Sequence, residues 1–244
     1  MTALDPYDYA VDAVVLDIEG TTSATGFVVD VLYPYARERF GELLASRGGE
    51  AEVARAVAQV REEIGEPDAD AARVEEVLGA WVDADRKATP LKTLQGILWA
   101  KGFARGELVS HFYPDVIEVL RRWHADGVRL YVYSSGSVAA QRAWFAHSAE
   151  GDLLGLVGGL YDTENAGPKQ EADSYRKIAS SVGVAPERLL FLSDRPGELD
   201  AARAAGWRAV GVRRAGEPYF DASFGDHPQV SDFSGISLAA RSSS

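Results

Sequence analysis

Three short apolar runs, each followed at once by small or acidic polar residues, constrain the fold of this chain more than any other feature. They occupy residues 13–17, 128–133 and 189–192. Continuous apolar runs of this length are typical of parallel strands that are buried on both faces of a sheet. We therefore predict three central strands, and weaker runs at 156–161 and 208–212 add two further candidates.

Segments with apolar residues at helical spacing separate the predicted strands. They cover residues 116–123, 139–146, 175–182 and 199–205. Strands that alternate with helices predict an α/β fold with a doubly wound parallel sheet. In such sheets ligands bind beyond the carboxyl ends of the strands, so the polar residues that follow the apolar runs are candidates for a functional site.

The region between residues 27 and 112 breaks this alternation, because it contains no convincing strand. Helical spacing covers residues 31–44, 51–64, 71–85 and 91–101, and the glycine and proline residues between them indicate turns. We therefore predict two domains. Residues 1–22 and 112–244 form the core, and residues 23–111 form an all-helical cap inserted after the first strand.

The composition excludes several classes of partner. With 25 Lys and Arg against 37 Asp and Glu, the net charge of −12 repels nucleic acid and anionic membrane surfaces. The absence of cysteine excludes disulfides and a cysteine nucleophile. No run approaches the roughly 20 apolar residues of a membrane span. The first residues of the sequence lack the basic segment and the apolar run of a secretory signal, so we do not expect one. We expect a cytoplasmic monomer without a nucleic-acid or membrane partner.

Two carboxylates stand at the end of the first predicted strand. Asp17 and Glu19 are two residues apart, and side chains at this spacing on a strand point to the same face. Gly20 allows the chain to turn, and Thr21 offers hydroxyl and amide donors for a phosphate group of the substrate. This arrangement suits a carboxylate nucleophile beside a general acid and base. The alternative is an acidic turn that only solvates the sheet edge.

Serine and lysine residues follow further along the chain. Ser134 and Ser135 come after the second strand and open a helix, where hydroxyls and amides can hold a phosphoryl group. They can equally serve as a helix cap. Lys169 stands just before a predicted helix, and a cation there opposes the helix dipole, which indicates an anionic partner. Most lysines, however, are simply solvated.

Acidic residues also follow the third strand. Asp194 comes directly after Ser193 and a few residues before Glu198. Acids that converge at strand ends suit Mg²⁺, which prefers oxygen ligands. For Glu198 a role as an ordinary acid in the first turn of a helix is equally open.

The order of these motifs resembles the four signature motifs of the haloacid dehalogenase superfamily of phosphotransferases. Glu19 in place of the more usual Asp narrows the resemblance to the enolase-phosphatase E1 family, also called acireductone synthases. Matching stretches outside the first motif are residues 30–37, 91–99, 131–137 and 174–178. They include parts of the helical insert, so the resemblance extends beyond the core. The loop at 195–197 is stiffer and more basic than the family pattern.

The resemblance implies a role for each motif residue. Asp17 would attack phosphorus and bind Mg²⁺, and Glu19 would bind Mg²⁺ through its main-chain carbonyl and serve as acid and base. Asp194 would complete the metal site. Ser134 and the Ser135 amide would bind the phosphoryl group, and Lys169 would neutralise its charge. These roles agree with those inferred above from the residue types and their spacing. In phosphoryl transfer a protein acts mainly by positioning the reacting groups and by neutralising the charge of the transferred group.

The resemblance also implies a substrate, a small phosphorylated diketone. In methionine salvage this family enolises 2,3-diketo-5-methylthiopentyl-1-phosphate and then dephosphorylates it to an acireductone. Lys92 and Gln95 match the family pattern on a predicted cap helix, so they would bind the substrate beneath a lid; the alternative is that they are solvated. We expect His111 to be structural.

Two other functions remain open. The first is a capped phosphatase of the same fold that acts on another small phosphomonoester. The second is a non-catalytic phospho-acceptor similar to the receiver domains of signalling proteins, which also combine strand-end acids with a Ser or Thr and a Lys. The long helical insert argues against the second, because it would obstruct the partner surface of a receiver.

Overall fold

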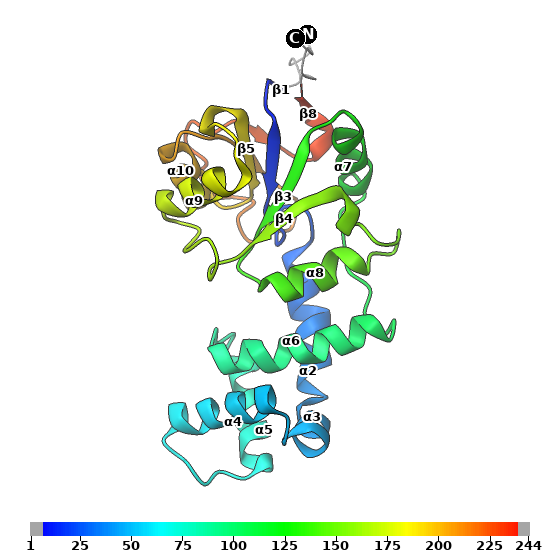
Figure 1. Cartoon of the computed structure of the whole chain (residues 1–244), viewed down its shortest axis with the longest axis vertical. Helices are drawn as coiled ribbons and strands as arrows, with labels where there is room; N and C mark the ends of the chain where they lie inside the picture. Colours follow the sequence, from blue (N-terminus) through cyan, green and yellow to red (C-terminus); the bar gives the residue numbers. More distant parts are fainter. Residues whose placement is uncertain (1–6, 239–244) are drawn as a thin grey trace. The chain divides into compact units, whose positions relative to one another are not determined.

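The computed structural model describes residues 7–238; residues 1–6 and 239–244, the two ends of the predicted core, lie outside the described range (Figure 1). The chain divides into two compact units, with one boundary between Thr25 and Gly26 and the other between Val109 and Ser110. The first unit contains the sheet, and the second is helical.

The sheet is parallel throughout, as the apolar runs predict. Its strands follow the spatial order β4-β3-β2-β5-β6-β7. Their bounds are β2 (Ala13–Leu16), β3 (Arg129–Tyr133), β4 (Val157–Tyr161), β5 (Leu189–Ser193), β6 (Arg208–Val212) and β7 (Gln229–Val230). All four residues of β2 and all five of β5 are buried, and the one polar residue among them, Ser193 at the end of β5, hydrogen-bonds to other buried side chains. The predicted α/β class is confirmed.

The strand order creates a switch point at β2. From β2 the chain proceeds outward through β3 and β4, and it then crosses to the other side of β2 to form β5, β6 and β7. Leu16 is in register with Val132 of β3 and Leu192 of β5. The carboxyl ends of these three strands are therefore level, and this is where ligands bind in open α/β sheets.

Helices cover both faces of the sheet. α9 (Ala172–Val182) and α10 (Pro196–Ala204) lie on one side of the strands, and α7 (Val116–Ala125) lies on the other (Figure 1). α8 (Val138–Ala146) follows β3 and contacts β4. The core under α9 and α10 contains several aromatic rings. Among them are Tyr133, Tyr175 and Phe191, whose ring centroids lie within 6.5 Å of one another.

The second unit is helical, as predicted. Its elements are η1 (Val28–Leu32, a π-helix), α2 (Tyr33–Arg37), α3 (Phe40–Arg47), α4 (Ala51–Ile64), α5 (Ala71–Asp83) and α6 (Thr89–Ala104), and the short α1 (Thr25–Phe27) precedes them at the boundary. The single helix predicted over 31–44 is interrupted. The amide of Arg39 donates to the carbonyl of Ala36, three residues back, with φ −116°, so the α-helical pattern breaks there.

Several very short elements were not predicted. β1 (Tyr7–Tyr9) and β8 (Ile236–Leu238) form a separate two-stranded parallel sheet. The 3₁₀ turns are η2 (Leu154–Leu156), η3 (Pro186–Arg188) and η4 (Phe233–Gly235). Two or three residues carry no measurable periodicity, so the sequence pattern contains no signal for them. Within residues 7–238 no helix combines the length and apolar character needed to cross a bilayer.

Candidate active site

Asp17 lies directly beyond β2 with its carboxylate held in a defined orientation. Its amide donates to the carbonyl of Leu192 at 3.0 Å, which continues the pairing with β5 for one more residue. The amide of Ile18 donates to Oδ1 at 2.8 Å. Only 3% of Asp17 is exposed. The end of the strand therefore presents one carboxylate in a site that is nearly closed to solvent.

The loop after Asp17 turns tightly around the carbonyl of Ile18. The amides of Thr21, Thr22 and Ser23 all donate to this oxygen, at 3.2, 3.0 and 2.9 Å. Gly20 has φ +72°, and a Cβ atom at this position would collide with the carboxylate of Asp194. The turn therefore requires glycine for two reasons, the backbone conformation and the contact with the end of β5.

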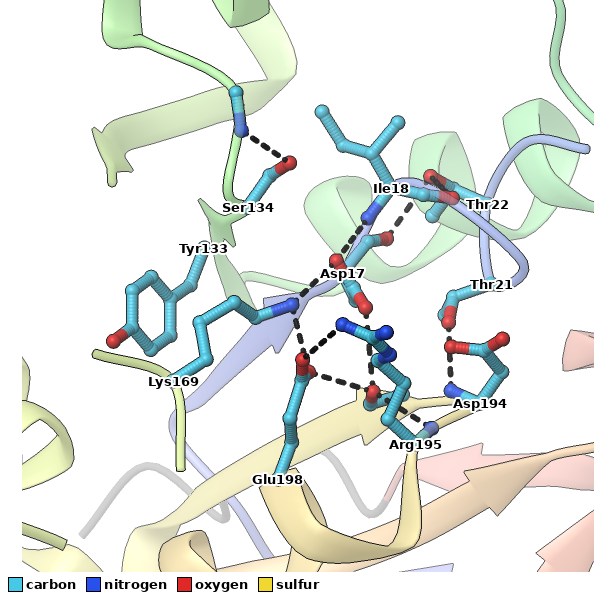
Figure 2. Close-up of polar contacts among 12 residues, drawn as sticks. Asp17, Ile18, Thr21, Thr22, Tyr133, Ser134, Lys169, Asp194, Arg195 and Glu198 are labelled. Carbon is cyan, nitrogen blue, oxygen red and sulfur yellow. Dashed lines mark hydrogen bonds and ion pairs between the residues drawn. The ribbon is translucent and has the colours of Figure 1, made fainter. Parts of the chain in front are cut away.

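Lys169 bridges two carboxylates in the interior of the site. Its Nζ lies 2.7 Å from Oδ1 of Asp17 and 2.7 Å from Oε2 of Glu198, as Figure 2 shows. Burial by itself would lower the pKa of Lys169, but the two carboxylates outweigh it and hold that pKa above its ordinary value. The ammonium group is therefore charged, and it contacts the candidate nucleophile.

The carboxylate of Asp194 has an unsatisfied oxygen. Its amide donates to Oγ1 of Thr21 at 2.9 Å, which holds the residue against the loop. Oδ1 is buried, and no hydrogen-bond donor among the described residues reaches it. Burial, reinforced by the charges of Asp17 and Glu198, raises the pKa of Asp194 to about 8. A buried carboxylate oxygen without a donor, close to further negative charge, is suited to a cation.

These residues fit a magnesium ion. Mg²⁺ is commonly held by one or two carboxylates and keeps several waters, so it does not need a cage of protein side chains. Among residues 7–238 no group of three or more His, Asp or Glu side chains is arranged to hold a metal. Asp17 and Asp194 supply two carboxylates, and the main-chain carbonyl of Glu19 lies on the loop between them.

Glu198 contacts this cluster and also stands in the first turn of a helix, so both features expected from the sequence are present. It lies in the first turn of α10 and is 1% exposed. Ser193 Oγ donates to its Oε2 at 2.9 Å and lies 3.3 Å from Oδ2 of Asp17. Burial and the charge of Asp17 raise the pKa of Glu198, and Lys169 opposes them. Glu198 is therefore a second carboxylate that holds Lys169 in place beside Asp17.

The two serines after β3 differ in their surroundings. Ser134 is buried, and its Oγ accepts from the amide of Gly136 at 3.2 Å. Ser135 is exposed. The helix cap is instead Ser137, whose Oγ accepts from the amide of Ala140 at 3.2 Å. In Figure 2, Ser134 lies at the same end of the strands as Asp17 and Lys169.

Three predicted substrate-binding residues remain, namely Thr21, Lys92 and Gln95. The hydroxyl of Thr21 is fully buried and faces the amide of Asp194, so its contact is with the protein. Lys92 and Gln95 belong to α6 in the helical unit, where Lys92 is exposed and Gln95 is buried. Gln95 is thus not a solvated position. The role of these two residues in binding the substrate stays a prediction.

His111 has a supporting position, at the return of the chain to the core. Its Nδ1 accepts from the amide of Ala24 at 3.2 Å and lies 3.2 Å from Oγ of Ser23. Burial lowers the pKa of His111, although the charge of Glu217 opposes the shift. These contacts join the two segments that connect the units, in line with the structural role expected for this residue.

Sequence reasoning assigned no role to Ser193 or to the side chain of Arg195. The Ser193 hydroxyl contacts Asp17 and Glu198, and Nη1 of Arg195 lies 3.7 Å from Oε1 of Glu198. The signal for Arg195 was present in the sequence, because it is a cation directly before the helix that begins at Pro196, and Lys169 likewise precedes a helix by a few residues.

Comparison with known proteins identifies the family of this chain. The family model described as haloacid dehalogenase-like hydrolase matches residues 11–206. A Streptomyces avermitilis protein named Enolase-phosphatase E1 is 73% identical over 95% of this chain and 97% of its own length. An Azotobacter vinelandii protein of the same name is 50% identical over 94% of this chain and 99% of its own length.

Among solved structures, the UTR4 protein of Saccharomyces cerevisiae is similar with a TM-score of 0.76 and 29% identity, and the match covers 91% of this chain and 98% of that protein. The CbbY protein of Rhodobacter sphaeroides, with 18% identity and a TM-score of 0.57, covering 94% of this chain and 98% of that protein, shares the fold. The chain therefore belongs to the haloacid dehalogenase-like hydrolases and, within them, to the enolase-phosphatase E1 family.

Proposed function

We propose that the protein is a Mg²⁺-dependent enolase-phosphatase of methionine salvage. It converts 2,3-diketo-5-methylthiopentyl-1-phosphate to the acireductone 1,2-dihydroxy-3-keto-5-methylthiopentene and phosphate. The observation that carries the proposal is the buried contact of 2.7 Å between Lys169 and Asp17, beside the unsatisfied carboxylate of Asp194. High identity to proteins named Enolase-phosphatase E1 supports the choice of substrate.

Phosphate transfer is assigned to Asp17 and Glu19. The carboxylate of Asp17 attacks phosphorus, the bond from phosphorus to the substrate oxygen breaks, and Glu19 gives that oxygen a proton. Water then attacks the aspartyl-phosphate while Glu19 takes a proton from it, which releases phosphate and restores both carboxyl groups. Glu19 is half-buried on the loop after Asp17, so water can approach it.

Charge neutralisation comes from Lys169 and the metal site. Lys169 faces the charge that develops on the transferring group, and Glu198 keeps its ammonium group oriented. The Asp17 and Asp194 carboxylates and the Glu19 carbonyl would hold Mg²⁺. When bound, Mg²⁺ supplies positive charge to the phosphoryl oxygens and to the enolate oxygen. Ser134 and the Ser135 amide orient the phosphoryl group.

The helical unit is proposed as the cap, with boundaries near residues 23 and 111. Lys92 and Gln95 bind the diketone there, and closure of the cap excludes water during enolisation. We further propose that the enzyme is a monomer in the cytoplasm. Light scattering on the purified protein should give a mass near 26.3 kDa.

The test uses purified protein, the diketo phosphate and Mg²⁺. Release of phosphate together with the absorbance of an enediol is expected, and chelation of Mg²⁺ should abolish both. Phosphate release without acireductone would leave only a phosphatase for another phosphomonoester. A phosphorylated Asp17 that persists for hours without turnover would indicate a phospho-acceptor instead.

The nucleophile is tested separately. We expect Asp17→Asn to reduce phosphate release by at least about a thousandfold while circular dichroism stays unchanged. Asp221→Asn, at an exposed position, is the matched control. Turnover retained in Asp17→Asn would assign the attack on phosphorus to another residue.

A further inference from the structure

Arg195 has a fixed backbone at the edge of the site. Its amide donates to Oγ of Ser193 at 3.1 Å, and its φ of −107° and ψ of 111° place it in extended conformation before α10. Pro196 follows and restricts Arg195 to this conformation. The residue is therefore held directly after Asp194, at the carboxyl end of β5.

Its side chain is held over the site. Nη2 donates to the hydroxyl of Tyr219 at 2.7 Å, and the guanidinium carbon lies 4.8 Å from the centre of the Tyr219 ring. Figure 2 shows the guanidinium group directed toward the carboxylates of Asp17 and Glu198. The side chain is 45% exposed, so a ligand that enters from solvent can reach it.

The guanidinium of Arg195 is charged. It stands at the N-terminal end of α10, where the helix dipole repels positive charge. Burial by itself would lower the pKa of this group, but the hydroxyl of Tyr219 and the charges of Glu198 and Asp17 outweigh burial and hold that pKa above its ordinary value. Glu198 is 3.7 Å away, beyond hydrogen-bond distance, and is already bound by Lys169. Within the described residues, Nε and Nη1 of Arg195 donate no hydrogen bond, so these two donors are available to a ligand.

We propose that Arg195 binds the phosphate group of the substrate as a second cation beside Lys169. The inference rests on the proposed phosphatase function and adds a residue to it. A phosphomonoester is a dianion, and three buried carboxylates, Asp17, Asp194 and Glu198, oppose its entry. The planar fork of arginine matches phosphate oxygens, and Tyr219 orients this fork in advance.

The test measures binding of inorganic phosphate in the presence of Mg²⁺ by calorimetry. Arg195→Gln should raise the Kd of phosphate about tenfold, which corresponds to about 1.4 kcal/mol. Arg195→Lys should recover part of this loss, and Tyr219→Phe should cause a smaller loss because the ring remains. Arg208→Gln, an exposed arginine at the amino end of β6, removes the same charge and should leave the Kd unchanged.

The outcomes separate this proposal from the function on which it rests. An unchanged phosphate Kd in Arg195→Gln would overturn it, even if KM for the diketo phosphate rises, because Arg195 would then bind the carbonyl end. If Arg195→Gln lowers kcat but leaves the Kd of phosphate unchanged, Arg195 acts through Glu198, and this result also overturns the proposal. If wild-type protein binds phosphate without turning over the diketone, only the proposed function fails. If Arg195→Gln does not fold, an unchanged Kd in both Arg195→Lys and Tyr219→Phe decides against the proposal.

Discussion

At the scale of single residues, the site depends on close contacts that tolerate no added atom. Gly20 is the clearest case, because its missing side chain leaves room for the carboxylate of Asp194. The same contact brings the loop that carries Glu19 against the end of β5. Gly20, which has no side chain of its own, therefore determines how closely the loop that carries Glu19 approaches Asp194.

Gly20→Ala tests this contact against a matched glycine. Gly127 also has positive φ, at +83°, but a Cβ there would meet nothing within 4 Å. Gly127→Ala should cost about 1–2 kcal/mol of unfolding free energy from backbone strain alone and keep full turnover. Gly20→Ala should cost more and also lower turnover by at least about tenfold. Equal effects on thermal unfolding and on kcat in both variants would show that Asp194 does not need this space.

The pKa of Asp194 predicts how stability depends on pH when Mg²⁺ is absent. Burial, with Asp17 and Glu198, raises this pKa from 3.8 to about 8, so between these pH values the folded protein binds more protons than the unfolded chain. The free energy of unfolding therefore falls as pH rises through this range. Thermal melting of metal-free protein should show this fall between pH 5 and 8.

Two comparisons identify the source of the fall. Asp194→Asn should reduce the slope, and the remainder comes from Glu198, whose raised pKa acts in the same direction. Saturating Mg²⁺ should also reduce the slope, because the cation takes the place of the proton. The exposed Asp226→Asn should keep the wild-type slope. A slope in Asp194→Asn equal to that of wild type would contradict the assignment.

At the scale of elements, one buried ion pair connects the loop after β2 to helix α7. Arg214, which follows β6, binds both carboxylate oxygens of Asp115, at 2.7 and 2.9 Å, and is 6% exposed. Its Nε also donates to the carbonyl of Thr21 at 3.2 Å, and Asp115 accepts from the amide of Phe233 at 2.9 Å. Four segments of the core therefore depend on one guanidinium group.

Arg214→Met should destabilise the protein strongly, because it leaves the half-buried charge of Asp115 without its partner. The expected loss is about 3–5 kcal/mol in urea unfolding. Arg121→Met removes an exposed pair with Glu150 in the same unit and should cost at most about 1 kcal/mol. If both variants lose the same free energy, the Arg214 contact is not a buried structural pair.

At the scale of the whole molecule, the helical unit is inserted between the first and second central strands, and its proposed function is to select the substrate. This role predicts a difference between two substrates. Lys92→Ala should reduce kcat/KM for the diketo phosphate about tenfold or more, while hydrolysis of a generic aryl phosphate changes less than twofold. Lys101→Ala, on the same helix, should affect neither. Equal losses on both substrates would refute a role of Lys92 in binding the diketone.

Much of the fold followed from local patterns. The strong apolar runs became β2, β3 and β5, because a strand buried on both faces is apolar over most of its length. Short elements such as β7 and β8 were missed, since they are held by neighbouring strands and not by their own sequence. The interruption at Arg39 was missed for a related reason, because helical spacing continues across it.

The sequence alone determined which residue types stand at the strand ends, namely Asp17, Ser134 and Asp194, because strand burial forces polar groups to the ends. Only the tertiary structure decided what each of them contacts. Lys169 meets Asp17 and Glu198 through the parallel register and the packing of α9 and α10. Such contacts join segments far apart in the chain, so their geometry depends on every layer between them, and no local pattern encodes it.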